Sequence, residues 1–429
     1  MTGVAARAAT WTGRAVAGGV AAWLLVGLVT WSSGRFWWGG AAPMLLAFAA
    51  PVAVLGAAAT PLLARLPLSR GERALAGLCL AALLLAVLRP LLSGRTWVWV
   101  VPDLMVPPLL FALLPAALLA MSLAASATAA ATAVTPLLTR LSPTARRWSV
   151  LPAAAALVLG LGQSGLEWRA PLGGGGAGPA PPGALRVVSW DTLCWNEGDD
   201  PARFLRYLKR WRADVYLLQE HAGCAPGALV PLHDEDLLRR EFPGSWFATA
   251  DGLLTISRYP VVGRTPVGWA VNPAAGNWNR AALRTDVRVG DRVVSLYNVH
   301  LYDMLYLDSS PLSGRFYRSI RTLDAARRTQ IDQLTADLSA NRNPLLASGD
   351  FNMLPGTGFA GRMDRWRDAS RAGTSISPAT LTFAGLRLWR MDWTFTSPDL
   401  RVHRYDLRSP EGLSSHHLQD MVVSLPPRP

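Results

Sequence analysis

The chain has 429 residues, which is longer than one typical domain, so we expect at least two domains. Its formal net charge is +13, from 42 Lys and Arg against 29 Asp and Glu. Residues 1–182 hold 12 Arg and 3 acidic residues, whereas residues 183–429 hold 30 basic and 26 acidic residues. A nucleic-acid-binding domain relies on neutralising phosphates, so the small excess in the C-terminal part argues against that class.

The N-terminal part contains recurring apolar stretches, at about 16–32, 42–64, 74–92, 104–134 and 148–163. A membrane-spanning helix needs about 20 mostly apolar residues. The stretch 42–64 meets this length, whereas 148–163 is short. Because apolar stretches recur, the pattern differs from a single cleavable signal peptide. We therefore predict about five transmembrane α-helices in residues 1–164 and a multi-pass protein of the cell membrane.

Arginine residues between the stretches predict the orientation. Alternate loops carry a richer set, which comprises Arg7, Arg14, Arg65, Arg70, Arg73, Arg140, Arg146 and Arg147. The remaining loops hold Arg35, Arg89 and Arg95. The positive-inside rule assigns the richer set to the cytoplasm. With five spans the C-terminal domain then lies outside the cytoplasmic membrane, whereas without a span at 148–163 it lies inside.

Two further features concern the connection and the redox compartment. Residues 165–183 are rich in Gly and Pro, so we predict a flexible tether before a soluble domain at 184–429. Cys194 and Cys224 are the only cysteines of that domain, and each follows a predicted strand. A disulfide between them would suit an oxidising exterior; two unpaired buried thiols are the alternative.

The C-terminal domain shows strand-like segments that end in polar side chains. Strands are predicted at 185–190, 214–220, 253–256, 280–287, 293–301, 390–395 and 421–425, and helices at 200–211 and 319–340. A further apolar run from Asn343 ends in Gly349-Asp350-Phe351-Asn352. Side chains two apart on an extended chain point the same way, so Asp350 and Asn352 can share one pocket.

Six short motifs occur in order along this domain: Ser189-Trp190-Asp191, Leu217-Leu218-Gln219-Glu220, Asn298-Val299-His300-Leu301, Gly349-Asp350-Phe351-Asn352, Met391-Asp392 and Ser415-His416-His417. Together they resemble the endonuclease/exonuclease/phosphatase superfamily over residues 184–429. The resemblance implies an α/β four-layer sandwich, with two mixed β-sheets flanked by helices, as in DNase I. It also implies a metal-dependent hydrolase of phosphoester bonds, with Mg²⁺ as the cofactor.

The resemblance also implies roles for individual residues. Glu220 would be the principal metal ligand, with Asp191 beside it. Asp350 would orient or deprotonate the attacking water, and Asn352 would hold a phosphate oxygen. His300 would contact the phosphate or the leaving group.

The remaining candidates concern substrate contact and proton transfer. Arg280 and Asn298 are the candidate substrate-binding residues. His417 would pair with Asp392, a carboxylate that stabilises the charged imidazole.

The chain departs from the family pattern at two positions. Asp191 stands where the family has Asn, and the last motif reads Ser-His-His where the family has Ser-Asp-His. If His417 is the family histidine, His416 replaces a metal-holding carboxylate, and its nitrogen would tilt the metal preference toward Mn²⁺ or Zn²⁺ over Mg²⁺. In the other register, His416 is the family histidine and Ser415 is the substitute.

These features predict a membrane-anchored, divalent-metal-dependent phosphoesterase that acts outside the cytoplasmic membrane. Because the domain is held near the bilayer, lipid-linked phosphoesters are attractive substrates. One alternative is an extracytoplasmic nuclease. Another is a catalytically inactive, membrane-bound binding or sensing module, which the departures at Asp191 and His416 keep open.

Overall fold

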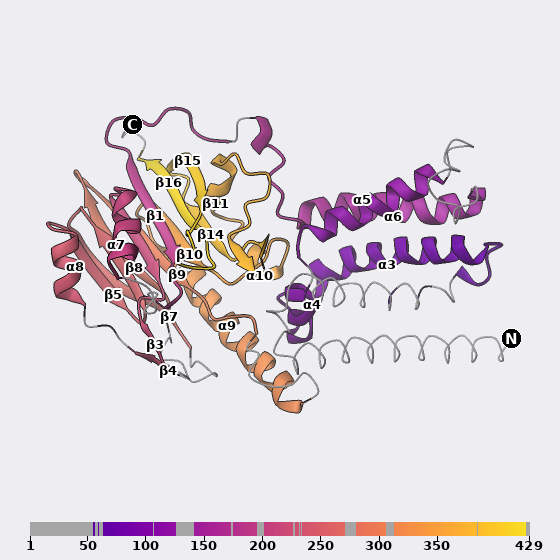
Figure 1. Cartoon of the computed structure of the whole chain (residues 1–429), viewed down its shortest axis with the longest axis horizontal. Helices are drawn as coiled ribbons and strands as arrows, with labels where there is room; N and C mark the ends of the chain where they lie inside the picture. The colour runs from indigo at the N-terminus through magenta and orange to yellow at the C-terminus, as the bar shows by residue number, and fades with distance from the viewer. Residues whose placement is uncertain are drawn as a thin grey trace.

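The structure is a computed structural model of the whole chain. It describes residues 55, 59, 63–105, 107–125, 141–172, 175–194, 201–225, 228–230, 232, 234–270, 280–305, 313–383 and 385–425. Its two parts are a set of apolar helices near the N-terminus and a sheet-based domain that contains the rest of the chain (Figure 1).

Two mixed six-stranded sheets form the centre of the C-terminal domain. The first, in the order β15-β16-β1-β2-β6-β5, contains β1 (Leu185–Asp191), β2 (Val215–Gln219), β5 (Trp246–Ala250), β6 (Leu253–Ser257), β15 (Arg401–Arg408) and β16 (Leu418–Ser424). The second, in the order β11-β14-β10-β9-β8-β7, contains β7 (Val261–Trp269), β8 (Arg280–Val289), β9 (Arg292–His300), β10 (Leu345–Asp350), β11 (Arg367–Asp368) and β14 (Asp392–Thr396).

Each sheet contains one parallel pair, β1 with β2 and β9 with β10, among antiparallel neighbours. Parallel strands end at the same edge of a sheet, so the polar residues after these four strands meet there. Two short hairpins lie outside the main sheets: β3 (Gly223–Ala225) with β4 (Ala228–Val230), and β12 (Leu381–Phe383) with β13 (Leu386–Trp389).

The sheets pack face to face and helices cover their outer faces. Val187, Leu217 and Leu346 belong to the apolar cluster between the sheets. Helices α7 (Pro201–Arg210) and α8 (Glu235–Glu241) cover the first sheet, and α9 (Gly314–Ala340) covers the second. Burial of these apolar surfaces is the main stabilising contribution. The two mixed sheets flanked by helices confirm the predicted sandwich.

The N-terminal part contains α3 (Arg70–Leu92), the 3-10 turn η1 (Trp97–Trp99), α4 (Val100–Met105), α5 (Leu110–Ala124) and α6 (Pro143–Gln163). Among the described residues, only α3 is long and apolar enough to cross a membrane, with a mean hydropathy of 2.3 over a window that is 50% buried. Helix α5 is too short, and α6 is less apolar than a span requires. The stretch 16–32, nearly all of 42–64 and residues 126–134 lie outside the described residues. The described residues thus hold one candidate span, and the multi-span prediction is not supported.

The Gly/Pro-rich stretch contacts the surface of the C-terminal domain. The backbone N–H of Gly175 donates to the carbonyl of Arg371 at 2.6 Å, and that of Ala177 donates to Val402 at 2.9 Å. His403 Nδ1 lies 3.0 Å from the carbonyl oxygen of Gly178. The prediction of a flexible tether is therefore wrong for these residues, because the domain surface satisfies their backbone groups.

A buried ion pair holds the start of β14, the strand that begins with Asp392. Arg390 binds both carboxylate oxygens of Asp368 at 2.6 and 2.8 Å, and its guanidinium lies 3.6 Å from the centre of the Trp393 ring. Burial opposes the ionisation of Asp368, but the charge of Arg390 outweighs it and lowers the pKa of that carboxyl.

Substitution of Asp368 by asparagine is expected to lower the free energy of unfolding by about 3 kcal/mol, because it leaves a buried guanidinium without its counter-charge. Since the folded-state pKa of Asp368 is depressed, this stabilisation is fully present above about pH 4 and is lost as the pH falls further. Denaturant unfolding at pH 7 and pH 3 measures both effects. The matched control is the exposed Asp399→Asn, and an equal effect of the two changes would contradict the role of the pair.

Candidate active site

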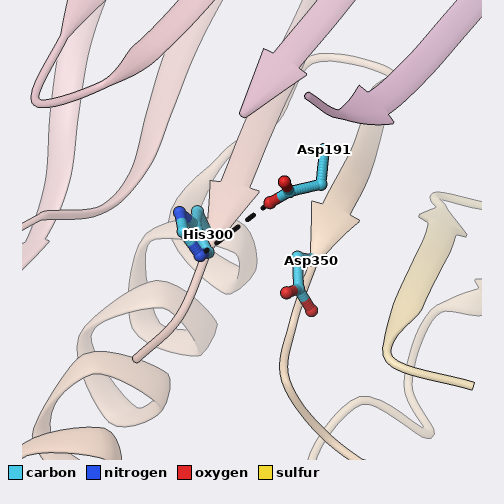
Figure 2. A group of neighbouring side chains, drawn as sticks. All are labelled: Asp191, His300 and Asp350. Atoms are coloured by element: carbon cyan, nitrogen blue, oxygen red, sulfur yellow. Dashed lines mark ion pairs between the residues drawn. The ribbon is translucent and has the colours of Figure 1, made fainter. Parts of the chain in front are cut away.

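The polar ends of four strands meet at one edge of the sandwich. Asp191 ends β1, and Glu220 follows the last residue of β2. His300 ends β9 and Asp350 ends β10, and the two are direct partners in the parallel register. Because the sheets face each other, side chains from both sheets reach the same space. Figure 2 shows Asp191 pointing toward His300, with Asp350 beside them.

The distances in this group suit a shared ligand. One ligand atom each from Asp191, His300 and Asp350 lie within 4.8 Å of one another. His300 Nε2 is 4.0 Å from Asp191 Oδ2 and 3.9 Å from Glu220 Oε1. The group is largely shielded from water, since the side chains of His300 and Glu220 are only 11% and 17% exposed.

The backbone around these carboxylates is held in sparsely populated conformations. Four non-glycine residues here, Leu193, Cys194, Glu220 and Asn352, have φ between +46° and +62°. Local hydrogen bonds fix the carboxylates: the N–H of Leu193 donates to Asp191 at 3.0 Å, and that of Cys194 donates to Glu220 at 2.8 Å. Left-handed backbone at non-glycine residues is costly and clusters at functional sites, which fits preorganised carboxylates.

Gly349 explains how Asp350 comes so close to β9. Its φ is +145°, and a Cβ at this position would lie 2.0 Å from the carbonyl oxygen of Val299. Only glycine permits this approach of two backbones. Asp350 is then fixed further by the Asn352 N–H, which donates to its Oδ1 at 2.7 Å.

The histidine that pairs with Asp392 is His416, so the pairing predicted for His417 is wrong. His416 Nδ1 lies 2.9 Å from Asp392 Oδ2, and both side chains are nearly buried. The indole N–H of Trp190 donates to the carbonyl of His416 at 2.9 Å and fixes its backbone. His417 instead places Nε2 3.2 Å from the Thr382 hydroxyl. This geometry corresponds to the second register, and the metal-ligand role of His416 stays a prediction.

The two histidines also differ in their electrostatics. Burial lowers the pKa of His416, but Asp392 and Asp191 outweigh it and raise that pKa well above its usual value. Burial and the charge of Arg387 lower the pKa of His417. A carboxylate on Nδ1 stabilises the imidazolium and fixes the tautomer, so His416 is built to carry a proton at Nε2.

The carboxylates of the site repel one another. Burial and the charge of Asp191 raise the pKa of Glu220 well above its usual value. Asp392 lies on β14 directly opposite Asp350 in the strand register. Burial and the charge of Asp392 raise the pKa of Asp350 in the same way. A divalent cation would relieve this repulsion, because opposite charge favours the ionised carboxylates.

The donor set fits a hard divalent metal. Asp191 Oδ2 is buried and has no hydrogen-bond partner in the described part of the chain. Asp191, Glu220 and Asp350 supply oxygen atoms, and His300 supplies one nitrogen. Oxygen ligands suit Mg²⁺, and a nitrogen donor is compatible with Mn²⁺. A bound ion would neutralise charge on a phosphoryl oxygen.

Asn298 is not available to bind substrate, which corrects the prediction. Its amide donates to the carbonyls of Leu218 and Leu254 at 2.9 and 3.0 Å and accepts from Gln219 at 2.5 Å. It is fully buried. These bonds join strands of the two sheets, so Asn298 has a structural role.

Two other predicted residues lie at the same sheet edge. Arg280 begins β8, which pairs with β9, and its Nε is 3.9 Å from Asp251. Asn352 donates its side-chain amide to the carbonyl of Leu301 at 2.9 Å. Their contacts with substrate stay predictions.

Sequence reasoning missed Asp303 and Arg327. The charge of Asp303 raises the pKa of Glu220 further, so this carboxylate lies near the site. Arg327 is buried on α9 and donates to the carbonyls of Tyr302 and Asn352, the latter at 2.6 Å. It thereby joins the loops that follow β9 and β10. An arginine on the apolar face of the predicted helix was the available signal, because such a residue needs buried partners.

The chain is similar to several solved structures and to one protein family. Solved structures similar to the chain include an endonuclease/exonuclease/phosphatase from Beutenbergia cavernae, with 19% identity, a TM-score of 0.42 and coverage of 56% of this chain and 72% of that one. The human Nocturnin catalytic domain has 16% identity, a TM-score of 0.41 and coverage of 58% and 97%. A mannosyl-6-phosphatase from Bacteroides thetaiotaomicron has 15% identity, a TM-score of 0.39 and coverage of 56% and 100%. A comparison with curated proteins gives no match. Residues 189–416, more than half of the chain, match the profile of the Endonuclease/Exonuclease/phosphatase family, and the chain therefore belongs to this family of phosphoester hydrolases.

Proposed function

We propose that the chain is a membrane-anchored, divalent-metal-dependent phosphoesterase that acts outside the cytoplasmic membrane. The observation that carries the chemistry is the convergence of Asp191, His300 and Asp350 from both sheets, with their ligand atoms within 4.8 Å. Phosphoester hydrolysis needs charge neutralisation at the phosphoryl oxygens and an aligned water. A buried cluster of carboxylates and imidazoles supports both needs.

The residues of the chain divide the chemistry between them. Asp350 is fixed by the Asn352 N–H and orients the attacking water or accepts its proton. His416, held by Asp392, provides a positive charge and a proton at Nε2 beside the phosphoryl group. His300 and Asn352 would contact phosphate oxygens or the leaving group. The pairing of His416 with Asp392 is retained, which speaks against an inactive binding module.

The helices support a membrane anchor and one orientation. Their exposed side chains include Leu91, Leu151 and Val158, which are 50%, 66% and 72% exposed. Helices α3 and α6 begin at the same end, where Glu72 accepts from the Ser142 N–H at 2.7 Å, and both end against the C-terminal domain. The arginines Arg70, Arg73, Arg146 and Arg147 lie near the starts of these helices.

Under the positive-inside rule, the arginine-rich end faces the cytoplasm. The catalytic domain at the other end then lies outside, whatever the total number of spans. A disulfide at Cys194 fits the same side, because disulfides persist in oxidising compartments. The small positive charge of residues 183–429 favours a lipid-linked or small phosphoester over a nucleic acid.

One experiment tests activity, metal dependence and location together. Cells that express the full chain are given bis-p-nitrophenyl phosphate, a charged ester that crosses membranes poorly. Intact cells are expected to hydrolyse it with external Mg²⁺ or Mn²⁺ and to stop when EDTA is added. Hydrolysis only after lysis would contradict the location, and EDTA-resistant hydrolysis would contradict the metal dependence. The matched control is a chain with Asp191→Asn, which should need more metal for half-maximal rate.

A further inference from the structure

The segment between α3 and α5 packs against the catalytic domain. Val100 and Val101 of α4 belong to one buried apolar cluster with residues of the C-terminal domain, including Phe316 and Ile320 at the start of α9. The indole N–H of Trp389 donates to the carbonyl of Leu104 at 3.3 Å. A short stretch of the helical part is thus built into the domain (Figure 1).

This cluster lies beside the active site. Met391 belongs to it and precedes Asp392, and Leu354 belongs to it and follows Asn352 by two residues. Leu381 packs against it and forms a β-bridge with His416. The cluster therefore borders the chain segments that carry Asp392, Asn352 and His416.

The contact is fixed by polar bonds and by close backbone approach. Arg89 and Ser93 bind the two oxygens of Asp103 at 3.1 and 2.6 Å, all with buried side chains. A Cβ on Gly94 would lie 2.9 Å from the Cα of Gly358. Side chains would not fit between these backbones, so the segment has one position relative to the site.

The outer margin of the cluster is apolar and only half-buried. We call it the junction ledge and define it by Trp97, Leu104, Leu305, Tyr317 and Phe383, which pack against the cluster and stay partly exposed. Leu305 follows His300 by five residues, and Trp97 follows the end of α3. The ledge therefore runs from the active site to the helices that carry exposed leucines. Partly exposed apolar side chains gathered beside a site offer a surface for an apolar group of a ligand.

We propose that the junction ledge binds the apolar chain of an amphiphilic phosphoester while its phosphate occupies the active site. This inference rests on the proposed function, since the chain of such a substrate must come from the bilayer that surrounds the helices. It names the substrate class as a phosphoester with a long alkyl or prenyl group. Specificity then comes partly from a segment outside the family domain, which begins at residue 189.

The test compares two alkyl p-nitrophenyl phosphodiesters, the methyl and the hexadecyl ester, with the purified full chain in mixed micelles and Mg²⁺ or Mn²⁺. The reacting phosphorus and the leaving group are the same in both. Burial of several methylenes should raise kcat/KM for the hexadecyl ester by roughly a hundredfold. Trp97→Ser and Leu305→Ser should each lower the ratio of kcat/KM for the hexadecyl ester to that for the methyl ester about tenfold. Neither change should alter kcat/KM for the methyl ester.

The matched control is Trp246→Ser, because Trp246 is 49% exposed on β5, in the edge strand of the other sheet. Equal kcat/KM for both esters in the unmodified chain would overturn the inference alone. An equal loss on both esters in the ledge variants would also overturn it, since the side chains would then only position the catalytic loops. Absence of hydrolysis of either ester would overturn the proposed function and the ledge together.

Discussion

Substitution of Asp350 by asparagine is expected to lower kcat for phosphodiester hydrolysis by about a thousandfold. Asparagine keeps the size of the side chain and can still accept the Asn352 N–H, so the loop should hold its shape. It cannot accept a proton, and it removes one negative charge from the site. Steady-state kinetics with bis-p-nitrophenyl phosphate at saturating Mg²⁺ or Mn²⁺ gives kcat and KM separately.

The control for this change is Asp332→Asn on α9, where the side chain is 64% exposed and pairs with Arg362. That variant should retain kcat within a factor of about two, as surface changes usually have small effects. If Asp350→Asn loses less than tenfold, another carboxylate activates the water. Asp303 would be the first to examine, because it lies near Glu220.

Substitution of His416 by alanine is expected to lower kcat by about a hundredfold or more, whereas His417→Ala should change it little. The reason is that only His416 is held by Asp392, at 2.9 Å, while His417 binds the Thr382 hydroxyl. The two variants differ by one position, so each is the other's control. The same kinetic assay measures both.

A second variant separates positioning from chemistry. Asp392→Asn keeps a hydrogen-bond acceptor for His416 Nδ1 but removes the charge that stabilises the imidazolium. It should lower kcat at every pH and shift the basic limb of the pH–rate profile to lower pH. A large loss of kcat in His417→Ala together with normal kcat in His416→Ala would instead identify His417 as the family histidine.

Much of the domain was readable from the sequence because its central strands are apolar. The strands predicted at 185–190, 214–220 and 293–301 correspond to β1, β2 and β9, since buried strands consist almost entirely of apolar residues before their polar ends. The motifs at their polar ends resemble those of the family, and this resemblance predicted Asp191, Glu220 and Asp350 as one group. The structure brings these residues together, and their catalytic and ligand roles stay predictions.

Two of the missed strands, β7 and β15, have a common physical reason. β15 reads RVHRYDLR, and β7 has mostly exposed side chains, so neither shows clear apolar alternation. Both lie at sheet edges, where charged residues are favoured. The identity of the paired histidine was equally hidden, because a one-residue shift in a loop reverses which ring reaches Asp392. Only the position of the backbone, fixed by Trp190, decides it.

The contact between Gly94 and Gly358 bears on how the chain folds and how it can be divided. The two glycines are more than 260 residues apart in sequence, yet no side chain fits between them. Phe316, Ile320 and Trp389 would be uncovered in a fragment that starts after the helices. Unfolding of either part removes buried surface from the other, so we expect the N-terminal helices and the C-terminal domain to unfold as one cooperative unit. A gene fragment that encodes only the family domain would lack part of its own core.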